Sequence, residues 1–338
     1  MIQIGVIGTG YWGKNLVRVF DEMPEANLYA CCDASESRLR QVQKSYPDIR
    51  LFTSTEAMVE DDEVEAVAIA TPSPTHFEVA KSALEAGKHV YVEKPLTLRS
   101  DDAEALVSLA RKNERQIMVG HLLLYHPAVT TIKGLIASGE LGDIYYVYAQ
   151  RLNLGIVRKD ENAWWSLAPH DISMVLYMFD SVPNAVSARG EGYLRHDNQD
   201  VVFANLGYSD RRMGQIHVSW LDPHKMRKIT VVGSRKMVVF DDMEPTEKIR
   251  IYDKGVDVTL GYESYGDAIT LRKGDIHIPQ IDMAEPLKRE CEHFISCINN
   301  KRDPLTDGRS GYDVVRVLEA GQQSLDRGGI PVGVEDNL

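Results

Sequence analysis

The sequence predicts an α/β protein of two domains, in which a doubly wound parallel sheet is followed by a domain with a large, mostly antiparallel sheet. Short apolar strands alternate with helices as far as about residue 120, which is typical of a parallel sheet covered on both faces. Longer alternating runs follow, with few helices between them. The length of 338 residues suits two domains of ordinary size.

The first part of the chain contains six short strands separated by helices. Residues 64–71 (VEAVAIAT) are an almost continuous apolar run, as expected of a central parallel strand. The strands are expected at 2–7, 27–33, 51–52, 64–71, 89–92 and 116–120, and the helices at 12–22, 35–45, 75–86 and 100–112. We therefore place the first domain at residues 1–122.

The second domain is expected at residues 123–338, with its last helix packed back on the first domain. Apolar residues at alternate positions, such as Val186 and Ala188, predict strands with one buried face. The other face is expected to meet a second subunit in a homodimer or homotetramer. The strands are expected at 143–152, 185–193, 201–208, 214–220, 228–232, 236–240 and 248–252, and the helices at 127–138, 170–180, 286–300 and 310–326.

Charge and composition narrow the class of function. A formal net charge of −12 disfavours binding to nucleic acid or to an anionic membrane. Apolar stretches are too short to span a bilayer, and the start of the chain lacks the basic region of a signal peptide. Cys31, Cys32, Cys291 and Cys297 form no CxxC pair, which indicates reduced thiols. We expect a cytoplasmic protein.

A glycine-rich turn after the first strand is the strongest local signal. Gly8, Thr9, Gly10, Tyr11, Trp12 and Gly13 form a G-x-G-x-x-G sequence that opens a helix. Such a turn lets backbone N–H groups and the helix N-terminus meet a pyrophosphate. Asp33 ends the second strand, where its carboxylate can accept hydrogen bonds from ribose hydroxyls and repel a 2′-phosphate. NAD is therefore favoured, and Arg38 keeps NADP open as the alternative.

Two further segments follow strands of the same sheet and should lie over the cofactor. Thr71 and Pro72 begin the first, which ends at His76. A purely structural role for this segment is the alternative to a cofactor contact. Glu93-Lys94-Pro95 is the second, and a lysine at a strand end inside a crevice is an unusual position for a surface charge. Glu93 can orient or balance Lys94.

Other catalytic centres find no support in the sequence. His121 and His126, like His217 and His224, lack companions at zinc-ligand spacings, so no metal site is expected. The G-x-S-x-G sequence of many serine hydrolases is absent.

The order of GTGYWG, Asp33, TPSPTH and EKP resembles the Gfo/Idh/MocA oxidoreductases, and the likeness extends to the closing helices. The resemblance implies a Rossmann first domain, a catalytic role for Lys94 and a turn at Pro95. It also implies that His170 is the catalytic histidine of a D-x-x-x-H segment. Ser166 occupies the aspartate position here, and the family's Arg-Phe segment after the sixth strand is replaced by HLLLYHP.

Three segments resemble the branch of this family that oxidises UDP-N-acetylglucosamine, or its uronic acid, at carbon 3. They are WWSLAPHDIS at 164–173, QRLNLGIVR at 150–158 and SWLDPHKMRKITVVGS at 219–234. The resemblance implies a nucleotide-sugar substrate whose 3-hydroxyl becomes a ketone. Open alternatives are a dehydrogenase or keto-reductase for another polyol, such as inositol or a sugar phosphate, and an NAD-binding sensor without turnover.

The implied chemistry gives the two catalytic residues different tasks. A histidine has a pKa close to neutrality, so His170 suits a base that removes the hydroxyl proton. Lys94 can stabilise the negative charge that develops on the same oxygen. They come from different domains, and we expect them to meet at the substrate. Without an aspartate at position 166, the pKa of His170 should be lower than in relatives that have one.

Candidate substrate-binding residues lie in the second domain and just before it. Arg151 and Arg158 could neutralise phosphate charge, and Asn153 could bind a polar sugar group. Tyr125 could line the cleft, and Trp165, with its neighbour Trp164, could stack on a sugar or uracil ring. Exposed-surface or core roles are the alternative for each of these residues.

Overall fold

The structure, a computed structural model, describes residues 1–155, 157–158, 161–196, 198–258 and 269–336. Ile156, inside one of the segments that carry the family resemblance, lies outside these residues. The chain divides into two compact units. Unit 1 contains residues 1–125, 284–319 and 336–338, and unit 2 contains residues 126–283 and 320–335.

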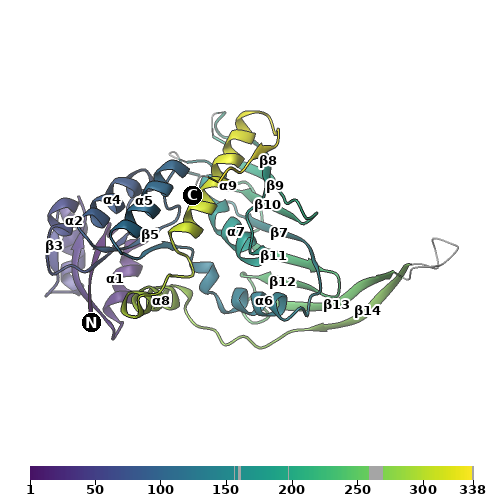
Figure 1. The fold of residues 1–338 in the computed structure, drawn as a ribbon, viewed down its shortest axis with the longest axis horizontal. Coiled ribbons are helices and arrows are strands. Elements are labelled where there is room, and N and C mark those ends of the chain that lie inside the picture. The colour runs from purple at the N-terminus through teal and green to yellow at the C-terminus, as the bar shows by residue number, and fades with distance from the viewer. Residues whose placement is uncertain (156, 159–160, 197, 259–268, 337–338) are drawn as a thin grey trace. The chain divides into compact units, whose positions relative to one another are not determined.

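Unit 1 is built on a six-stranded parallel sheet with the order β3-β2-β1-β4-β5-β6 (Figure 1). The strands are β1 Ile2–Ile7, β2 Ala26–Cys32, β3 Arg50–Phe52, β4 Ala66–Ile69, β5 His89–Glu93 and β6 Ile117–Gly120. The helices are α1 Gly13–Asp21, α2 Glu36–Ser45, α3 Thr55–Val59, α4 His76–Glu85 and α5 Ser100–Lys112, with short 3-10 turns η1 at Ser73–Thr75 and η2 at Leu122–Tyr125. The predicted doubly wound sheet is confirmed.

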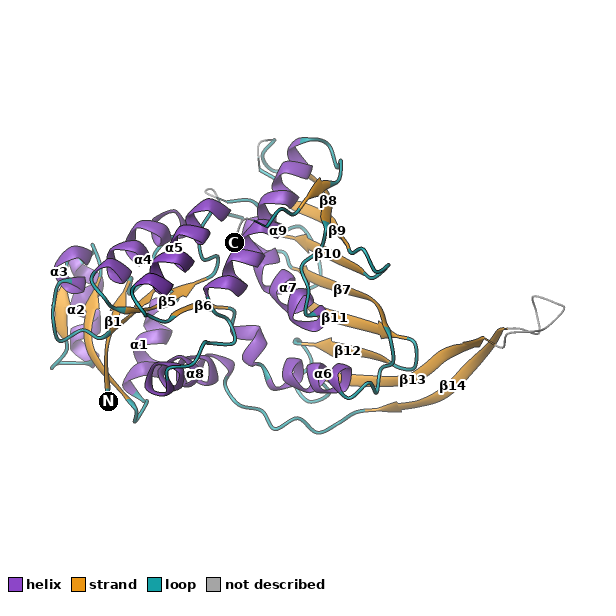
Figure 2. Cartoon of the chain, viewed as in Figure 1, coloured by secondary structure: helices purple, strands orange, loops and turns teal. Residues whose placement is uncertain are grey.

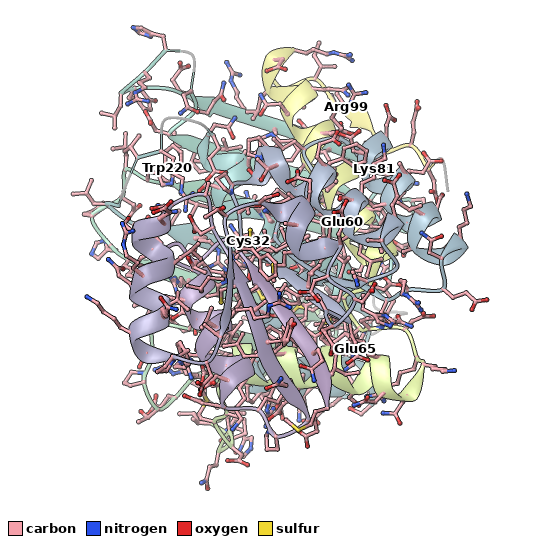
Figure 3. The ribbon with its side chains drawn as sticks, turned by 90° about the vertical axis from the view of Figure 1, so that its left-hand side faces the viewer. Cys32, Glu60, Glu65, Lys81, Arg99 and Trp220 are labelled. Atoms are coloured by element: carbon pink, nitrogen blue, oxygen red, sulfur yellow. The ribbon has the colours of Figure 1, made fainter. Side chains whose placement is uncertain are left out.

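The core of unit 1 follows from the apolar strands. All four residues of β4 are buried, since the sheet is covered on both faces. Helices α4 and α5 pack against each other, and α4 also packs on β4 and β5. Cys32, labelled in Figure 3, is buried at the end of β2, where burial raises the pKa of its thiol to about 11. All four cysteines are free thiols in the interior.

The end of the chain also contributes to unit 1. Helix α8, Pro286–Asn300, and the first part of α9, Gly308–Asp326, belong to this unit. Tyr312 and Val315 of α9 are fully buried in its core. The chain therefore enters unit 1 three times, whereas the sequence predicted one boundary after residue 122.

Unit 2 is built on a nine-stranded sheet with the order β14-β13-β12-β11-β7-β10-β9-β8-β15 (Figure 2). The strands are β7 Ile144–Leu152, β8 Ala185–Glu191, β9 Val201–Gly207, β10 Met213–Ser219, β11 Met226–Gly233, β12 Met237–Asp241, β13 Ile249–Val258, β14 Ile269–His277 and β15 Val332–Gly333. The helices are α6 Pro127–Ala137, α7 Ala163–Phe179 and the last part of α9. All pairings are antiparallel except β7 with β10, so the predicted mostly antiparallel sheet is confirmed.

Burial alternates along the strands of unit 2, as the sequence predicted. In β9 every second residue is buried, and the same period appears in β10. Helix α7 packs on β7, β9 and β10, and thereby covers the apolar face. The opposite face keeps aromatic residues partly exposed, including Phe203, whose ring stacks on His217 with centroids 4.1 Å apart.

Several elements of unit 2 differ from the prediction, among them the short strand β15, which was not expected. Helix α7 begins at Ala163, well before the expected residue 170, because Asn162 caps its N-terminus by accepting a hydrogen bond from the Trp165 N–H at 3.0 Å. Pro169 inside the helix concealed this start. Strand β14 was not predicted, although it pairs with β13 over most of its length. In the described part of the chain, no helix has the length and apolarity needed to cross a membrane.

Candidate active site

The residues predicted to bind the dinucleotide follow the carboxyl ends of neighbouring strands in unit 1. Ile7 at the end of β1 pairs with Cys32 and with Ile69, and Ile69 pairs with Val92. Because these strand ends are in register, the segments that follow them emerge together at the carboxyl-terminal end of the sheet. They are residues 8–13, 33–38, 70–76 and 93–95.

The glycine-rich turn has the shape that a pyrophosphate requires. Gly8 has φ +91°, and a Cβ there would lie 2.8 Å from the Ala70 backbone. A Cβ on Gly13 would lie 1.8 Å from the Gly8 carbonyl oxygen, so the turn and helix α1 can close only with glycine. A Cβ on Gly10 would approach only the Arg38 side chain, at 3.7 Å, which leaves open space at the position where the dinucleotide backbone approaches. The loop fits NAD.

Asp33 is held beside this turn as an ionised acceptor. One carboxylate oxygen accepts hydrogen bonds from the Thr9 N–H at 2.8 Å and the Thr9 hydroxyl at 3.1 Å. The other accepts from the Ser35 N–H at 2.9 Å. Burial alone would raise the pKa of Asp33, but these donors and Arg38 lower it below its usual value. Arg38 lies 3.5 Å away and is more than half exposed, so it is an additional partner rather than a fixed one.

His76 joins the segments that follow β4 and β5. Its Nδ1 lies 2.7 Å from the Pro95 carbonyl oxygen, and its Nε2 lies 2.9 Å from that of Thr71. The ring is buried, and burial lowers its pKa even though both carbonyl contacts raise it. A neutral ring donates only one hydrogen bond at a time. Both ring nitrogens thus face backbone carbonyls, which makes His76 a support for the turn at Lys94.

Glu93 connects the turn at Lys94 to the glycine-rich loop. The Trp12 indole N–H donates a hydrogen bond to its carboxylate, and the Tyr91 hydroxyl lies 3.1 Å from the same oxygen. Burial raises the pKa of Glu93 to about 7, against the opposing effects of Trp12 and Lys94. Tyr11, in contrast, is 86% exposed, with the Lys14 ammonium over its ring.

His121 was not predicted to be functional, yet it directly follows β6, at the same carboxyl-terminal end of the sheet. It is 1% exposed, and neither ring nitrogen has a hydrogen-bond partner among the described residues. Burial, together with the charge of Lys94, lowers its pKa to about 3. The signal in the sequence was a histidine directly after a strand of the parallel sheet.

In unit 2, helix α7 carries the predicted catalytic histidine. His170 is partly buried, and Ser166 lies one turn earlier at 7% exposure. Residues four apart on a helix share a face, so Ser166 and His170 are neighbours on α7. The helix start is fixed by Asn162, whose side-chain amide donates to Gln199 and Gln322, each at 2.8 Å.

Two predicted substrate contacts have other roles inside their units. Arg151 is 8% exposed and binds Asp171 through two hydrogen bonds, at 2.8 and 3.0 Å, so its charge is already balanced. Tyr125 is 6% exposed, and its hydroxyl lies 3.0 Å from that of Thr306. Both residues therefore have the core role that was the alternative to substrate binding.

The remaining candidates differ in how accessible they are. The Arg158 side chain is 57% exposed and lies 3.1 Å from Glu161. Asn153 and Trp165 are partly buried. Trp164 is fully buried, and Gly321 of α9 packs so closely on its indole that a Cβ there would lie 2.5 Å away. Of the two neighbouring tryptophans, Trp164 is thus a core residue and Trp165 is the accessible one.

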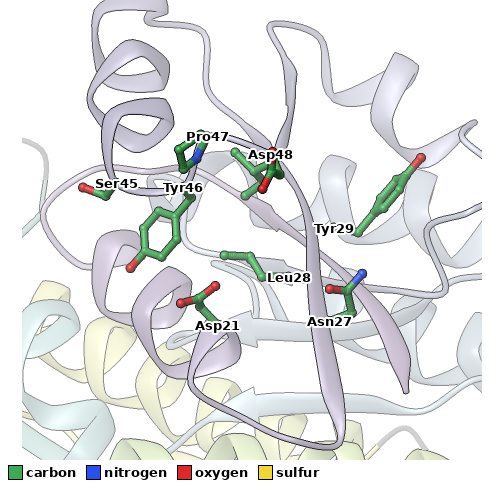
Figure 4. A pocket seen from close by; sticks show the side chains of 9 residues that line it. Asp21, Asn27, Leu28, Tyr29, Ser45, Tyr46, Pro47 and Asp48 are labelled. Atoms are coloured by element: carbon green, nitrogen blue, oxygen red, sulfur yellow. The ribbon is translucent and has the colours of Figure 1, made fainter.

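A pocket of about 440 Å³ lies at the opposite end of the unit 1 sheet, where strand β2 begins (Figure 4). It is lined by the first residues of β2, the end of α1 and the segment after α2, including Asp21, Tyr29 and Tyr46. Ligands of open parallel sheets bind outside the carboxyl ends of the strands, whereas this pocket lies at an amino end. It is separate from the cofactor residues.

Comparison with known proteins agrees with this arrangement. Residues 2–121 match the profile of the "Oxidoreductase family, NAD-binding Rossmann fold", and residues 129–239 match the "GFO/IDH/MocA C-terminal domain". The chain belongs to the Gfo/Idh/MocA oxidoreductase family. It is therefore an oxidoreductase with NAD as cofactor, held by the Rossmann domain in unit 1.

Several relatives are named for sugar or polyol chemistry. UDP-N-acetylglucosamine 3-dehydrogenase from Acidithiobacillus ferrooxidans is 28% identical over 95% of this chain and 96% of its own length. The solved structure of that organism's GnnA, also a UDP-N-acetylglucosamine 3-dehydrogenase, matches with a TM-score of 0.81 at 25% identity, covering 96% of this chain and 98% of the other. The NADP-dependent scyllo-inositol 2-dehydrogenase IolW from Bacillus subtilis is 30% identical over 55% of this chain and 54% of its own.

Proposed function

We propose that the chain is an NAD-dependent dehydrogenase that oxidises the 3-hydroxyl of a UDP-N-acetylhexosamine, UDP-GlcNAc or its uronic acid, to the 3-keto sugar. The observation that carries this proposal is the similarity to a UDP-N-acetylglucosamine 3-dehydrogenase over 95% of the chain. Lys94 after β5 and His170 on α7 are the proposed catalytic pair. The residues on either side of Lys94 are held in place, because His76 contacts the Pro95 carbonyl and the Trp12 indole donates to Glu93.

The chemistry divides between the cofactor and the chain. NAD, when bound, accepts the hydride from the carbon that carries the hydroxyl. His170 removes the hydroxyl proton as a general base. Lys94 donates a hydrogen bond to the same oxygen and stabilises the negative charge that develops there. Both residues therefore act on the same hydroxyl group. Loss of either should reduce turnover strongly and should affect the affinity for the cofactor much less.

Recognition of the nucleotide sugar rests on fewer residues than the sequence alone indicated. Arg158 is the remaining arginine candidate for the diphosphate, because the Arg151 guanidinium is bound to Asp171. Asn153 is proposed to bind a polar sugar group, and Trp165 to stack on a ring. Each of these three side chains is at least partly accessible.

The rival is a dehydrogenase or keto-reductase for a different polyol, such as inositol or a sugar phosphate. The observation that favours it is the 30% identity to an inositol dehydrogenase over about half of the chain. The family resemblance implies an aspartate at position 166, where this chain has Ser166. This difference favours a third candidate, an NAD-binding sensor without turnover.

The test is incubation with NAD and each of UDP-GlcNAc, UDP-GlcNAc uronic acid, UDP-glucose and myo-inositol, following absorbance from NADH. A parallel reaction with an aminotransferase and glutamate traps a 3-ketone as an amine. We expect signal with an N-acetylated UDP sugar alone. Signal only with inositol supports the rival, and no turnover with any substrate while NAD still binds supports the sensor.

Variants then test the catalytic pair. Lys94→Ala and His170→Ala should abolish turnover while NAD binding is retained, whereas Lys112→Ala, on the exposed surface of α5, should leave both unchanged. Turnover retained in Lys94→Ala would reject its catalytic role.

A further inference from the structure

A row of buried polar groups runs through unit 1 from helix α8 to the glycine-rich loop. The Glu290 carboxyl of α8 lies 2.9 Å from the Tyr91 hydroxyl, which lies 3.1 Å from the Glu93 carboxyl. The Trp12 indole N–H donates to the same Glu93 oxygen. Glu290 and Tyr91 are both 0% exposed. Nothing in the proposed hydride transfer uses Glu290 or Tyr91.

Counting protons shows that the row contains a neutral acid. The Tyr91 hydroxyl has one proton and can donate to only one of the two carboxyl groups in contact with it. The other carboxyl must then supply a proton of its own, since two bare oxygens at this distance would repel each other. Two contacts between three oxygen-bearing groups therefore require one protonated carboxyl.

Glu290 is the carboxyl that holds this proton. Glu93 accepts from the Trp12 N–H and is next to the Lys94 ammonium, and both favour its ionised form. The second oxygen of Glu290 is buried and has no hydrogen-bond partner among the described residues. Burial first, and then the charge of Glu93, raises the pKa of Glu290 well above its usual value. An ionised Glu290 would be a buried charge with one hydrogen bond.

The hydrogen bonds then point one way along the row. With the proton on Glu290, its carboxyl donates to the Tyr91 oxygen across the 2.9 Å contact. The Tyr91 hydroxyl then gives its own proton to the hydrogen bond with Glu93, which also accepts from Trp12. A Cβ on Gly120 would lie 2.8 Å from the Tyr91 oxygen and 2.9 Å from Glu93, so the neighbouring strand leaves room for this arrangement only as glycine.

We propose that Glu290 is a positioning residue for the dinucleotide: as a neutral acid it orients Tyr91 and the Glu93 carboxylate, which fixes the Trp12 indole and with it the pyrophosphate-binding turn. Helix α8 comes from the end of the chain, so the cofactor loop depends on a segment remote from it in sequence. Packing between α1 and α8 and the 2.5 Å ion pair of Arg18 with Glu285 hold the two helices together.

The test compares two replacements of Glu290 by their affinity for NADH, measured by titration without any sugar. Glu290→Gln keeps a neutral donor to Tyr91, so its Kd should stay within about threefold of the parent. Glu290→Leu keeps the volume but donates nothing, so its Kd should rise about tenfold, which corresponds to 1.4 kcal/mol. Glu292→Leu, at an exposed position on the same helix, is the matched control and should bind as the parent does.

An infrared spectrum at pH 8 reports the proton directly. The parent should show the band of a protonated carboxyl group, and the band should be absent from Glu290→Gln. Tyr91→Phe provides a second route if Glu290→Leu does not fold, because it removes the relay with little change of shape and should weaken NADH binding about tenfold.

Three results would overturn the inference: equal weakening by Gln and Leu, parent-like NADH binding by Glu290→Leu, or absence of the infrared band from the parent. A purely structural role would lower stability in both Glu290 variants without the selective rescue by Gln. Since NADH binding requires no sugar, failure of the proposed dehydrogenase activity would leave this test intact.

Discussion

Arg151 and Asp171 form a buried two-point ion pair, in which Nε lies 2.8 Å from Oδ2 and Nη2 lies 3.0 Å from Oδ1. Both side chains are at most 10% exposed. The pair joins β7 to α7, and Asp171 directly follows His170 in the chain. Asp171 is therefore bound to Arg151 and does not take the place of the aspartate that is absent from position 166.

Breaking this pair should cost stability, since each single replacement leaves a buried charge without its partner. We expect Arg151→Met to lower the free energy of unfolding by about 3–5 kcal/mol. Arg158→Met is the matched control: the Arg158 side chain is 57% exposed, so loss of its pair with Glu161 should cost at most about 1 kcal/mol. Urea denaturation measures both. Arg158→Met should instead raise the KM for the nucleotide sugar, and a larger stability loss from Arg158 than from Arg151 would contradict this assignment.

Replacement of Asp33 should change the choice of cofactor. Its carboxylate sits beside Thr9 and repels a 2′-phosphate, while Arg38 lies 3.5 Å away on an exposed side chain. Asp33→Ala should raise the ratio of kcat/KM for NADP to that for NAD by about tenfold or more, because one repulsion is removed and Arg38 is released. Asp33→Ala combined with Arg38→Ala should lose most of this gain. An unchanged ratio in the single variant would show that Asp33 does not select the cofactor.

Much of unit 1 could be predicted from local sequence. The apolar run of β1 is matched residue for residue, and helix α5 begins and ends where its polar and apolar pattern does. The glycine-rich turn was predictable because its steric demands are local, as the close approach of Gly13 to Gly8 shows. These features depend on residues near one another in the chain.

Features that depend on distant partners were missed. Arginine is a residue type that commonly binds phosphate, so the sequence indicated such a role for Arg151. Only the fold shows that Asp171 neutralises its charge. Glu290 lies three residues after Leu287 and four before Phe294, on the buried face of α8. A carboxyl at such a position is a signal of a buried polar contact. Its partner Tyr91 is 199 residues away, so the pattern alone could not name it.

His121 should make the stability of the protein sensitive to acid. Its pKa is about 6.5 in the unfolded chain and about 3 in the folded protein, so the folded form does not take up a proton that the unfolded form accepts. This contribution is fully present above pH 6.5 and is lost as the pH falls toward 3. Between pH 6.5 and 4.5 the loss amounts to about 2 kcal/mol.

Replacement by glutamine removes this titration. His121→Gln should therefore lose about 2 kcal/mol less than the parent over the same pH range, measured by urea denaturation at each pH. His224→Gln, at a side chain 81% exposed, should leave the pH dependence unchanged. Parallel curves for His121→Gln and the parent would show that His121 does not carry this effect.

The uncovered face of the unit 2 sheet is expected to form the contact between subunits. Phe203 is 49% exposed and stacks on His217, and Met213 is 59% exposed at the neighbouring strand. Phe203→Asp should shift a dimer or tetramer toward the monomer, since it places a charge in an apolar contact. Tyr193→Asp, at an exposed position outside the strands, should not. Light scattering after size-exclusion chromatography decides, and a monomeric parent at micromolar concentration would reject the interface.

Restoring an acid at position 166 should move the pH profile of turnover. Ser166 and His170 share a face of α7, so an aspartate at 166 would place a negative charge beside the imidazole and raise its pKa. The acid limb of kcat/KM reports the base in the free enzyme, so in Ser166→Asp it should shift to higher pH. Ser166→Asn, which has nearly the same shape without the charge, should leave the limb in place. A limb unmoved by aspartate in a folded, NAD-binding variant would mean that His170 is not the base that sets the rate.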